Sequence, residues 1–187
     1  MNEADLAKAS RFEALVLPHL DALYNYARRL TRDPHEAQDL VQEAILRAAR
    51  YFESFRGDEA RPWLFRILRN SFRSGRRRDD PLLVPLDDER HHPEAGGDPE
   101  AQLIQADAKR MVDAALAALP VAAREILVLR EIEDFSYRQI AEILDLPVGT
   151  VMSRLARARD ALAVELRRRE QGVVRLHPAM TGGRHGL

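Results

Sequence analysis

Apolar residues recur at three- and four-residue spacing over most of the chain, and stretches rich in proline, glycine or charge separate the segments. This spacing places the apolar side chains on one face of a helix. Ala, Leu, Arg and Glu dominate, and the runs of β-branched residues that strands favour are missing. The pattern predicts an all-α fold. The expected helices cover residues 12–30, 34–51, 62–76, 100–119, 120–132 and 136–144, and a last helix begins at 149.

The first two helices carry clear start and break signals. Pro18 is expected to kink or split the segment 12–30, because proline removes a backbone donor and clashes with the preceding turn. Asp33, Pro34 and Glu36 form a strong helix start. Aspartate caps the first turn, proline fits the first helical position, and glutamate fits the third.

The helix 34–51 has a core-facing stripe and an opposite polar face. The stripe consists of Ala37, Leu40, Val41, Ala44, Ile45 and Ala48. Leu46 lies on the polar face, whose other members are Asp39, Gln42, Glu43 and Arg50. A leucine ringed by carboxylates is typical of a protein-docking surface. Single exposed leucines are also common, so the pattern alone leaves both interpretations open.

The helix 62–76 is basic on its outer side. Residues 60–78 contain seven arginines and no acid. The inward stripe consists of Leu64, Ile67, Leu68 and Ser71, whereas the outer face is formed by Arg66, Arg69, Arg73, Arg76 and Arg77, bordered by Trp63, Asn70, Phe65 and Phe72. Arginines interleaved with aromatics suit a nucleic-acid strand, because phosphates meet arginine and unstacked bases stack on rings. The alternative is that the aromatic side chains belong to the core and the arginines are merely solvated.

The stretch 135–162 predicts a helix-turn-helix. Ser136 is a good N-cap for the first helix, and Asp145 can adopt the left-handed geometry that ends it. Pro147 cannot continue that helix, and a second helix follows from Gly149. On this second helix, one stripe is apolar: Val151, Leu155, Ala158 and Leu162.

The opposite side of the second helix is small and hydrogen-bonding, with Ser153, Ala156, Arg157 and Asp160, and Arg154 and Arg159 flank the apolar stripe. Such a face suits the DNA major groove, where outer side chains read base edges and flanking arginines hold phosphates. An ordinary amphipathic surface helix with solvated arginines is the alternative.

Charge and composition indicate how the chain is divided into domains. The net charge is only −1, but residues 79–107 hold nine acids against a single base, Arg90. This segment is rich in proline and predicts an acidic flexible linker between two small helical domains. The second would be a four-helix domain. We expect domains at 11–78 and 107–169, the linker at 79–106, and a disordered tail at 170–187.

Several chemistries are excluded or not indicated. The chain has no cysteine, which excludes disulfides and cysteine-ligated metals. His91 and His92 lack further ligands at helical spacing, so no metal or other cofactor is expected. No apolar run reaches the length of a membrane span, and the N-terminus lacks the apolar region of a signal peptide. We therefore expect a cytoplasmic protein without membrane insertion.

Three motifs, in this order, resemble a bacterial sigma factor of the extracytoplasmic-function class. Asp39-Leu40-Val41-Gln42-Glu43 is similar to the family's polymerase-binding helix. Pro62-Trp63-Leu64 with the arginine run is similar to its minus-ten helix. Pro147 to Arg159 is similar to its minus-thirty-five helix-turn-helix. The resemblance covers about 12–78 and 107–168, and Met152 and Ala156 depart from larger or basic side chains in many relatives.

The resemblance implies a subunit of RNA polymerase holoenzyme that contacts both large subunits and promoter DNA, and that an anti-sigma factor commonly holds inactive. The implied polymerase contacts are Asp39, Leu40, Gln42, Glu43, Leu46 and Arg47. The implied minus-ten contacts are Trp63, Arg66, Arg69, Asn70, Arg73, Arg76 and Arg77. The implied minus-thirty-five contacts are Tyr137, Arg138, Thr150, Met152, Ser153, Arg154, Ala156 and Arg157.

Two other classes of function would need features that the sequence does not contain. A stand-alone helix-turn-helix repressor or activator would need a dimer interface, and no heptad or sensor domain supplies one. An enzyme would need a phosphate loop, a metal cluster or a nucleophile with its base, and the sequence contains none of these patterns. A non-catalytic promoter-specificity subunit is therefore the expected function.

Overall fold

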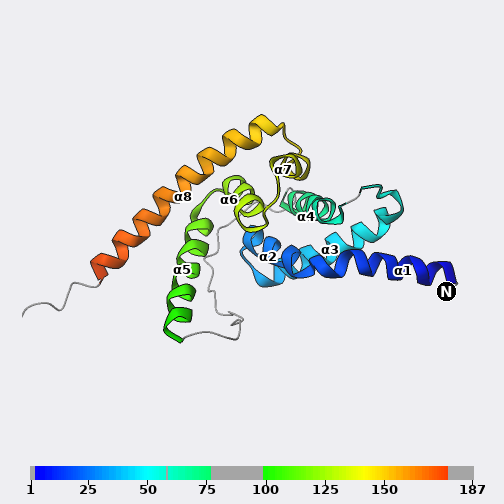
Figure 1. Cartoon of the computed structure of the whole chain (residues 1–187), viewed down its shortest axis with the longest axis horizontal. Helices are drawn as coiled ribbons and strands as arrows, with labels where there is room; N and C mark the ends of the chain where they lie inside the picture. Colours follow the sequence, from blue (N-terminus) through cyan, green and yellow to red (C-terminus); the bar gives the residue numbers. More distant parts are fainter. Residues whose placement is uncertain (1–2, 58, 77–98, 177–187) are drawn as a thin grey trace, which may run out of the picture.

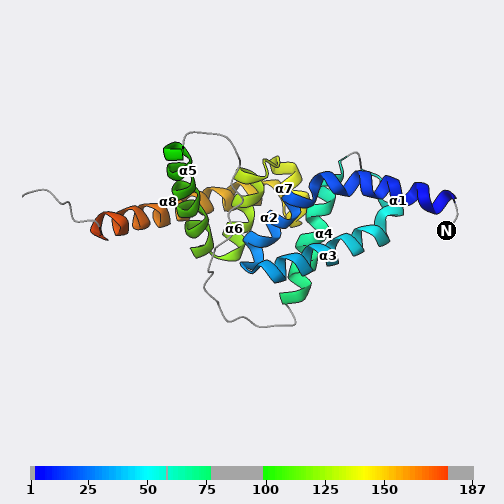
Figure 2. The same cartoon turned by 90° about the horizontal axis from the view of Figure 1, so that it is seen from below.

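A computed structural model describes residues 3–57, 59–76 and 99–176. Every regular element among these residues is helical, which confirms the predicted all-α fold (Figure 1). Helices α1–α4 form one unit and α5–α8 a second, and the two units lie against each other in both views (Figure 2). No helix among the described residues has both the length and the apolar character that a membrane crossing needs.

The first unit begins with a helix that is split by proline. Helix α1 (Glu3–Val16) ends in a 3-10 turn at Leu17–His19, and α2 (Leu20–Thr31) follows it. Pro18 lies within that turn, so the expected break is confirmed. Helix α1 starts well before the predicted residue 12, because the polar stretch that precedes Phe12 is helical too.

Helices α2, α3 (Pro34–Tyr51) and α4 (Ala60–Arg76) pack on one another. The Asp33 carboxylate caps α3 by accepting bonds from the backbone N–H groups of His35 at 2.7 Å and Glu36 at 2.8 Å. All predicted stripe residues of α3 are buried except Ile45, which is partly buried against the core. Phe65 and Phe72 of α4 are also buried, so for these two rings the core interpretation holds.

The second unit contains α5 (Pro99–Ala118), α6 (Val121–Leu127), α7 (Tyr137–Leu144) and α8 (Val148–Leu176). The four helices expected for this unit are present. Helix α5 begins one residue before the helix expected over residues 100–119, and α8 extends through residues 170–176, beyond the expected domain end at 169. Residues 77–98 and 177–187, which include most of the predicted linker and tail, lie outside the described residues.

A π-helical turn at Val128–Ile132 extends α6. The Glu133 N–H donates to the Val128 carbonyl at 3.0 Å, five residues back, which marks the wider turn. Asp134 then adopts a left-handed φ of 52°, a conformation that aspartate tolerates. Together these features turn Phe135 inward, where it is 2% exposed and packs on Phe65 of the first unit.

The cap of α7 gives a stability prediction. Replacing Ser136 with Ala removes the hydroxyl that accepts from the Gln139 N–H, and should lower the free energy of unfolding by about 1 kcal/mol. Ser10→Ala is the matched control, because Ser10 lies inside α1 and is exposed; it should change stability by no more than about 0.5 kcal/mol. Urea unfolding followed by circular dichroism measures both. Equal values for the two variants would contradict the capping role.

Candidate functional site

The helix-turn-helix forms as predicted, and its local contacts explain its shape. Ser136 and Gln139 make a reciprocal capping box at the start of α7. Asp145 ends α7 in the left-handed conformation, at φ 52°, and the Leu146 N–H donates to the Ala141 carbonyl at 3.0 Å. The Pro147 carbonyl accepts from the Thr150 and Val151 N–H groups, which opens α8 directly after the turn. Proline thus contributes an acceptor where it cannot contribute a donor.

The first turns of α8 present a free outer face. Val151, Leu155 and Ala158 are buried against the rest of the unit. The predicted minus-thirty-five residues on the other side are exposed: Met152, Ser153, Arg154, Ala156 and Arg157. Arg138 is exposed as well, whereas Tyr137 and Thr150 are half-buried.

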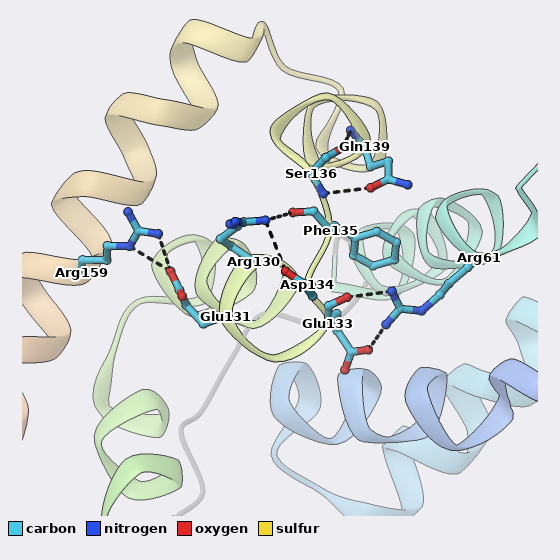
Figure 3. A network of polar contacts seen from close by, with 9 residues as sticks. All are labelled: Arg61, Arg130, Glu131, Glu133, Asp134, Phe135, Ser136, Gln139 and Arg159. Carbon is cyan, nitrogen blue, oxygen red and sulfur yellow. Dashed lines mark hydrogen bonds and ion pairs between the residues drawn. The ribbon is translucent and has the colours of Figure 1, made fainter.

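Two arginines of α8 have different environments. Within the described part of the chain, Arg157 donates only to a backbone carbonyl of its own helix, that of Ser153 at 3.3 Å, so its outer nitrogens can meet an external acceptor. Arg159 is committed to Glu131 at 2.7 Å, and this pair ties α8 to the turn after α6 (Figure 3). Hydrogen bonding to Glu131 raises the pKa of Arg159. Arg159 therefore has a structural partner within its own unit.

The outer face of α3 is acidic and carries an exposed leucine. Leu46 is 62% exposed, and Asp39, Gln42 and Glu43 are exposed beside it. Arg47 forms an ion pair with Glu43 on the same face. Leu40, which was also expected to contact polymerase, is only 7% exposed because it belongs to the core stripe of the helix.

The basic face of α4 is smaller than predicted. Arg66, Asn70 and Arg73 are exposed. Trp63 is half-buried and stacks on Phe55, with ring centroids 4.6 Å apart. The side chain of Arg76 and the whole of Arg77 lie outside the described part of the structure. The exposed side chains form a continuous run along one side of α4.

Arg69 corrects the prediction of a fully exposed arginine face. Its side chain is 8% exposed and its Nε lies 3.2 Å from a carboxylate oxygen of Glu125, on α6 of the other unit. The same carboxylate accepts from the Tyr26 hydroxyl at 3.4 Å. The second unit covers this part of α4, so Arg69 does not contact solvent or DNA in this conformation.

Burial governs the ionisation of this cluster. It raises the pKa of Glu125 above its ordinary value of 4.5, although the Arg69 guanidinium and the Tyr26 hydroxyl oppose the rise. Burial and the neighbouring Glu125 charge also raise the pKa of Tyr26, which keeps its proton available for the carboxylate. The cluster is satisfied internally, as buried charges require.

A second polar cluster joins the units around Arg61 (Figure 3). Arg61 donates to the Glu133 carbonyl at 2.7 Å and to its carboxylate at 2.6 Å. Its guanidinium also lies over the Phe135 ring, 4.3 Å from the centroid. Arg61, Glu125 and Glu133 are not among the predicted site residues. The available signal was charge at core-facing spacing, since Arg124 and Glu125 lie between Val121 and Val128 on the inner stripe of α6.

No group of histidines, cysteines and carboxylates that could hold a metal occurs within 3–57, 59–76 and 99–176. What the structure offers instead is three exposed helix faces of different chemistry. The face on α3 is acidic with an apolar centre, that on α4 is basic and aromatic, and that on α8 is small and hydrogen-bonding.

Comparison with protein families places all three faces within two known regions. Residues 15–81 match "Sigma-70 region 2", and residues 109–162 match "Sigma-70, region 4". The first match contains α3 and α4, and the second contains the helix-turn-helix.

Individual proteins agree with the family matches. The RNA polymerase sigma-H factor of Pseudomonas aeruginosa is 36% identical over 161 residues, or 81% of this chain and 83% of that protein. The ECF RNA polymerase sigma-E factor of Escherichia coli is 37% identical over 139 residues, covering 68% of this chain and 72% of that protein. Among solved structures, the sigma factor RpoE of Bartonella quintana, in complex with the anti-sigma factor NepR, superposes with a TM-score of 0.67 at 31% identity, covering 84% of this chain and 97% of that one.

The raised pKa of Glu125 gives a pH prediction. In the pH range between the ordinary value of 4.5 and the raised pKa, the folded chain binds more protons at Glu125 than the unfolded chain does. The stabilisation linked to this site is therefore fully present below 4.5 and is lost as pH rises through the raised pKa. Glu125→Gln should flatten this part of the profile. Urea unfolding of both proteins at a series of pH values measures the difference, and parallel profiles would contradict the shift.

Proposed function

The chain belongs to the extracytoplasmic-function class of sigma-70-family RNA polymerase sigma factors, and from this premise we propose that it binds core RNA polymerase and directs promoter-specific initiation. The observation that carries the proposal is the exposed outer face of α8, in a helix-turn-helix that lies within the region 4 match. The acidic face of α3, within the region 2 match, supplies a second contact surface of different chemistry.

The two units have different roles in the proposed function. The first, residues 11–78, binds polymerase and melts the minus-ten element, with Trp63, Arg66, Asn70 and Arg73 on the DNA side. Arginines hold the phosphates, and a half-buried ring is a stacking surface for an unpaired base. The second unit reads the minus-thirty-five element in the major groove through the outer face of α8. The acidic segment between the units connects the two sites.

Polymerase docking is assigned to the α3 face. Leu46 is an exposed apolar side chain on a polar face, and the acidic Asp39 and Glu43 lie on the same face. An apolar centre with a polar rim is the usual arrangement of an interface hot spot. We assign Gln42 and Arg47 to the rim of the same surface, and infer that the chain acts in the cytoplasm, where core polymerase works.

This function is non-catalytic, as sigma factors are initiation factors rather than enzymes. A stand-alone repressor is the less favoured alternative, because the family matches cover region 2, which contains the α3 face, as well as the helix-turn-helix. Regulation by an anti-sigma factor is also proposed. It is supported by two similar structures that contain one: RpoE with NepR, and CnrH with the cytosolic domain of CnrY at a TM-score of 0.57 and 29% identity.

Run-off transcription with core polymerase on a promoter library tests the proposal. The chain plus core polymerase should give transcripts from one class of promoter, and core polymerase alone should not. Specific operator binding by the isolated chain, with no effect on polymerase, would support the repressor instead.

Arg157 offers a test of promoter reading. Arg157→Ala should weaken minus-thirty-five recognition by about 1–3 kcal/mol if the side chain contacts a base. Arg167→Ala is a matched control, because Arg167 is also exposed on α8 and its Nε also donates to the carbonyl four residues back, that of Ala163 at 3.0 Å. Promoter competition assays compare the variants. Equal promoter selection by both would remove Arg157 from the base contacts.

Charge reversal tests the α3 surface. The double variant Asp39→Lys, Glu43→Lys should lose binding to core polymerase, because two basic side chains replace the acids around Leu46. The control is Glu13→Lys, Asp21→Lys, which reverses two exposed acids on α1 and α2. Native gel shift with core polymerase measures assembly, and circular dichroism checks folding. Normal assembly of a folded Asp39/Glu43 variant would refute the docking assignment.

A further inference from the structure

The first turns of α8 lie at the outer edge of the second unit, next to α7 (Figure 1), and carry an exposed line of apolar side chains. Val148, Met152 and Ala156 follow one another at four-residue spacing, so they lie in one line along the helix. Val148 is 40% exposed, Met152 is 53% exposed, and Ala156 is exposed as well. We call these three side chains the apolar strip. Single exposed apolar residues are common, whereas a continuous apolar surface is typical of a contact site.

Gly149 lies beside the apolar strip, three residues before Met152 on the same side of the helix. Glycine destabilises a helix relative to alanine. A Cβ added at Gly149 would meet nothing within 4 Å in the described structure, so packing inside the chain does not account for the missing side chain. The missing side chain does allow another molecule to approach the α8 backbone closely. The apolar strip and Gly149 therefore form one surface that suits a closely fitting external partner.

The charges around this surface indicate what kind of group it can contact. Arg154 and Arg157 are exposed on the opposite flank of α8, where they can meet phosphates or base edges. Arg159 lies on the same flank as Met152, but it is paired with Glu131 at 2.7 Å (Figure 3). Because that pair compensates its own charge, the flank of the apolar strip offers little attraction to a phosphate. An uncharged, apolar group of the partner fits this flank better.

A DNA major groove contains such a group. Its base edges present hydrogen-bond donors and acceptors, together with one apolar group, the C5 methyl of thymine, which alanine and other apolar side chains contact. Met152 and Ala156 are separated by about 6 Å along the helix axis, close to two base-pair steps of about 3.4 Å each. Methionine is also flexible and polarizable, so it can fit closely against a methyl group. The strip therefore has the chemistry and the length to meet thymine methyls.

We propose that the apolar strip recognises the C5 methyl groups of thymines in the minus-thirty-five element, with Met152 as the main contact and Gly149 allowing the close approach. This inference rests on the proposed sigma function. It divides the selection of bases between two flanks of α8. Arg157 distinguishes bases by hydrogen bonding, whereas Met152 distinguishes a base that carries the methyl group from one that lacks it.

Replacing thymine with deoxyuridine provides the test, because uracil keeps the hydrogen-bonding groups of thymine and lacks only the methyl. The probe is the promoter that the chain and core polymerase select from the library, with each thymine of its minus-thirty-five element replaced singly, on either strand. At one position or more, the replacement should lower the run-off yield of the unmodified chain by about threefold, the effect of one buried methyl-sized group. Met152→Ala should lower the yield from the thymine promoter similarly, and should no longer respond to deoxyuridine there.

Val164→Ala is the matched control, because Val164 is 62% exposed on α8 but lies beyond residues 109–162, which match region 4. This variant should keep both its yield and its response to deoxyuridine. A selected element without a deoxyuridine-sensitive thymine would overturn the proposal, as would a Met152→Ala variant that responds like the unmodified chain. If Met152→Ala lost yield but kept that response, the strip would contact a protein instead. If the unmodified chain gives no promoter-specific transcript, the proposed sigma function itself fails and this inference falls with it.

A second variant tests the close approach at Gly149. Gly149→Ala should raise the urea midpoint of unfolding, because alanine favours the helix and the added methyl meets nothing within 4 Å in the described structure. The same variant should lower the run-off yield from the selected promoter by about fivefold or more, because the methyl occupies space that the DNA needs. A chain that is more stable but less active cannot owe its loss to misfolding. Unchanged yield would show that DNA does not approach this part of α8, and would overturn the proposal.

Discussion

A charged side chain that leaves water must find an opposite charge or a full set of hydrogen bonds, and this requirement organises the contact between the two units. Arg69 and Glu125 are both buried, and neither has an alternative ionic partner on its own unit in the described structure. Each therefore depends on the other unit for its solvation. The position of α6 over α4 follows from this need, together with the apolar contact of Phe65 with Phe135.

The same requirement makes the contact reversible. A buried ion pair gains little net free energy, because desolvation of the two ions nearly offsets their attraction. Once the units separate, water can solvate Arg69 and Glu125 again, so the charges do not oppose opening as strongly as an apolar surface of equal area would. Beside these charges, the edge-to-face pair of Phe65 and Phe135 adds non-polar contact between the units. Such an interface fixes one orientation of the two units, but a partner that buries more surface can compete with it.

Local features were predictable from the sequence because their causes are local. The Asp33 and Ser136 caps, the break at Pro18 and the left-handed Asp145 each depend on a few neighbouring residues. The buried position of Arg69 was not predictable in this way. Helical periodicity assigns it to the polar side of α4, but periodicity of one helix does not say whether another unit covers that side. The π-helical turn before Glu133 was also not predictable, since it widens the helix without a distinctive residue pattern.

The outer face of the helix-turn-helix has to be considered together with the basic face of α4. Its outer face is small, with Met152 and Ala156 where bulkier or basic side chains would add contacts, so this face alone should bind duplex weakly. In the proposed function, weak binding is sufficient because polymerase would hold α4 and α8 over one promoter, and tethering makes the second contact intramolecular. In the proposed function, promoter specificity therefore depends on the spacing at which polymerase holds two weak sites.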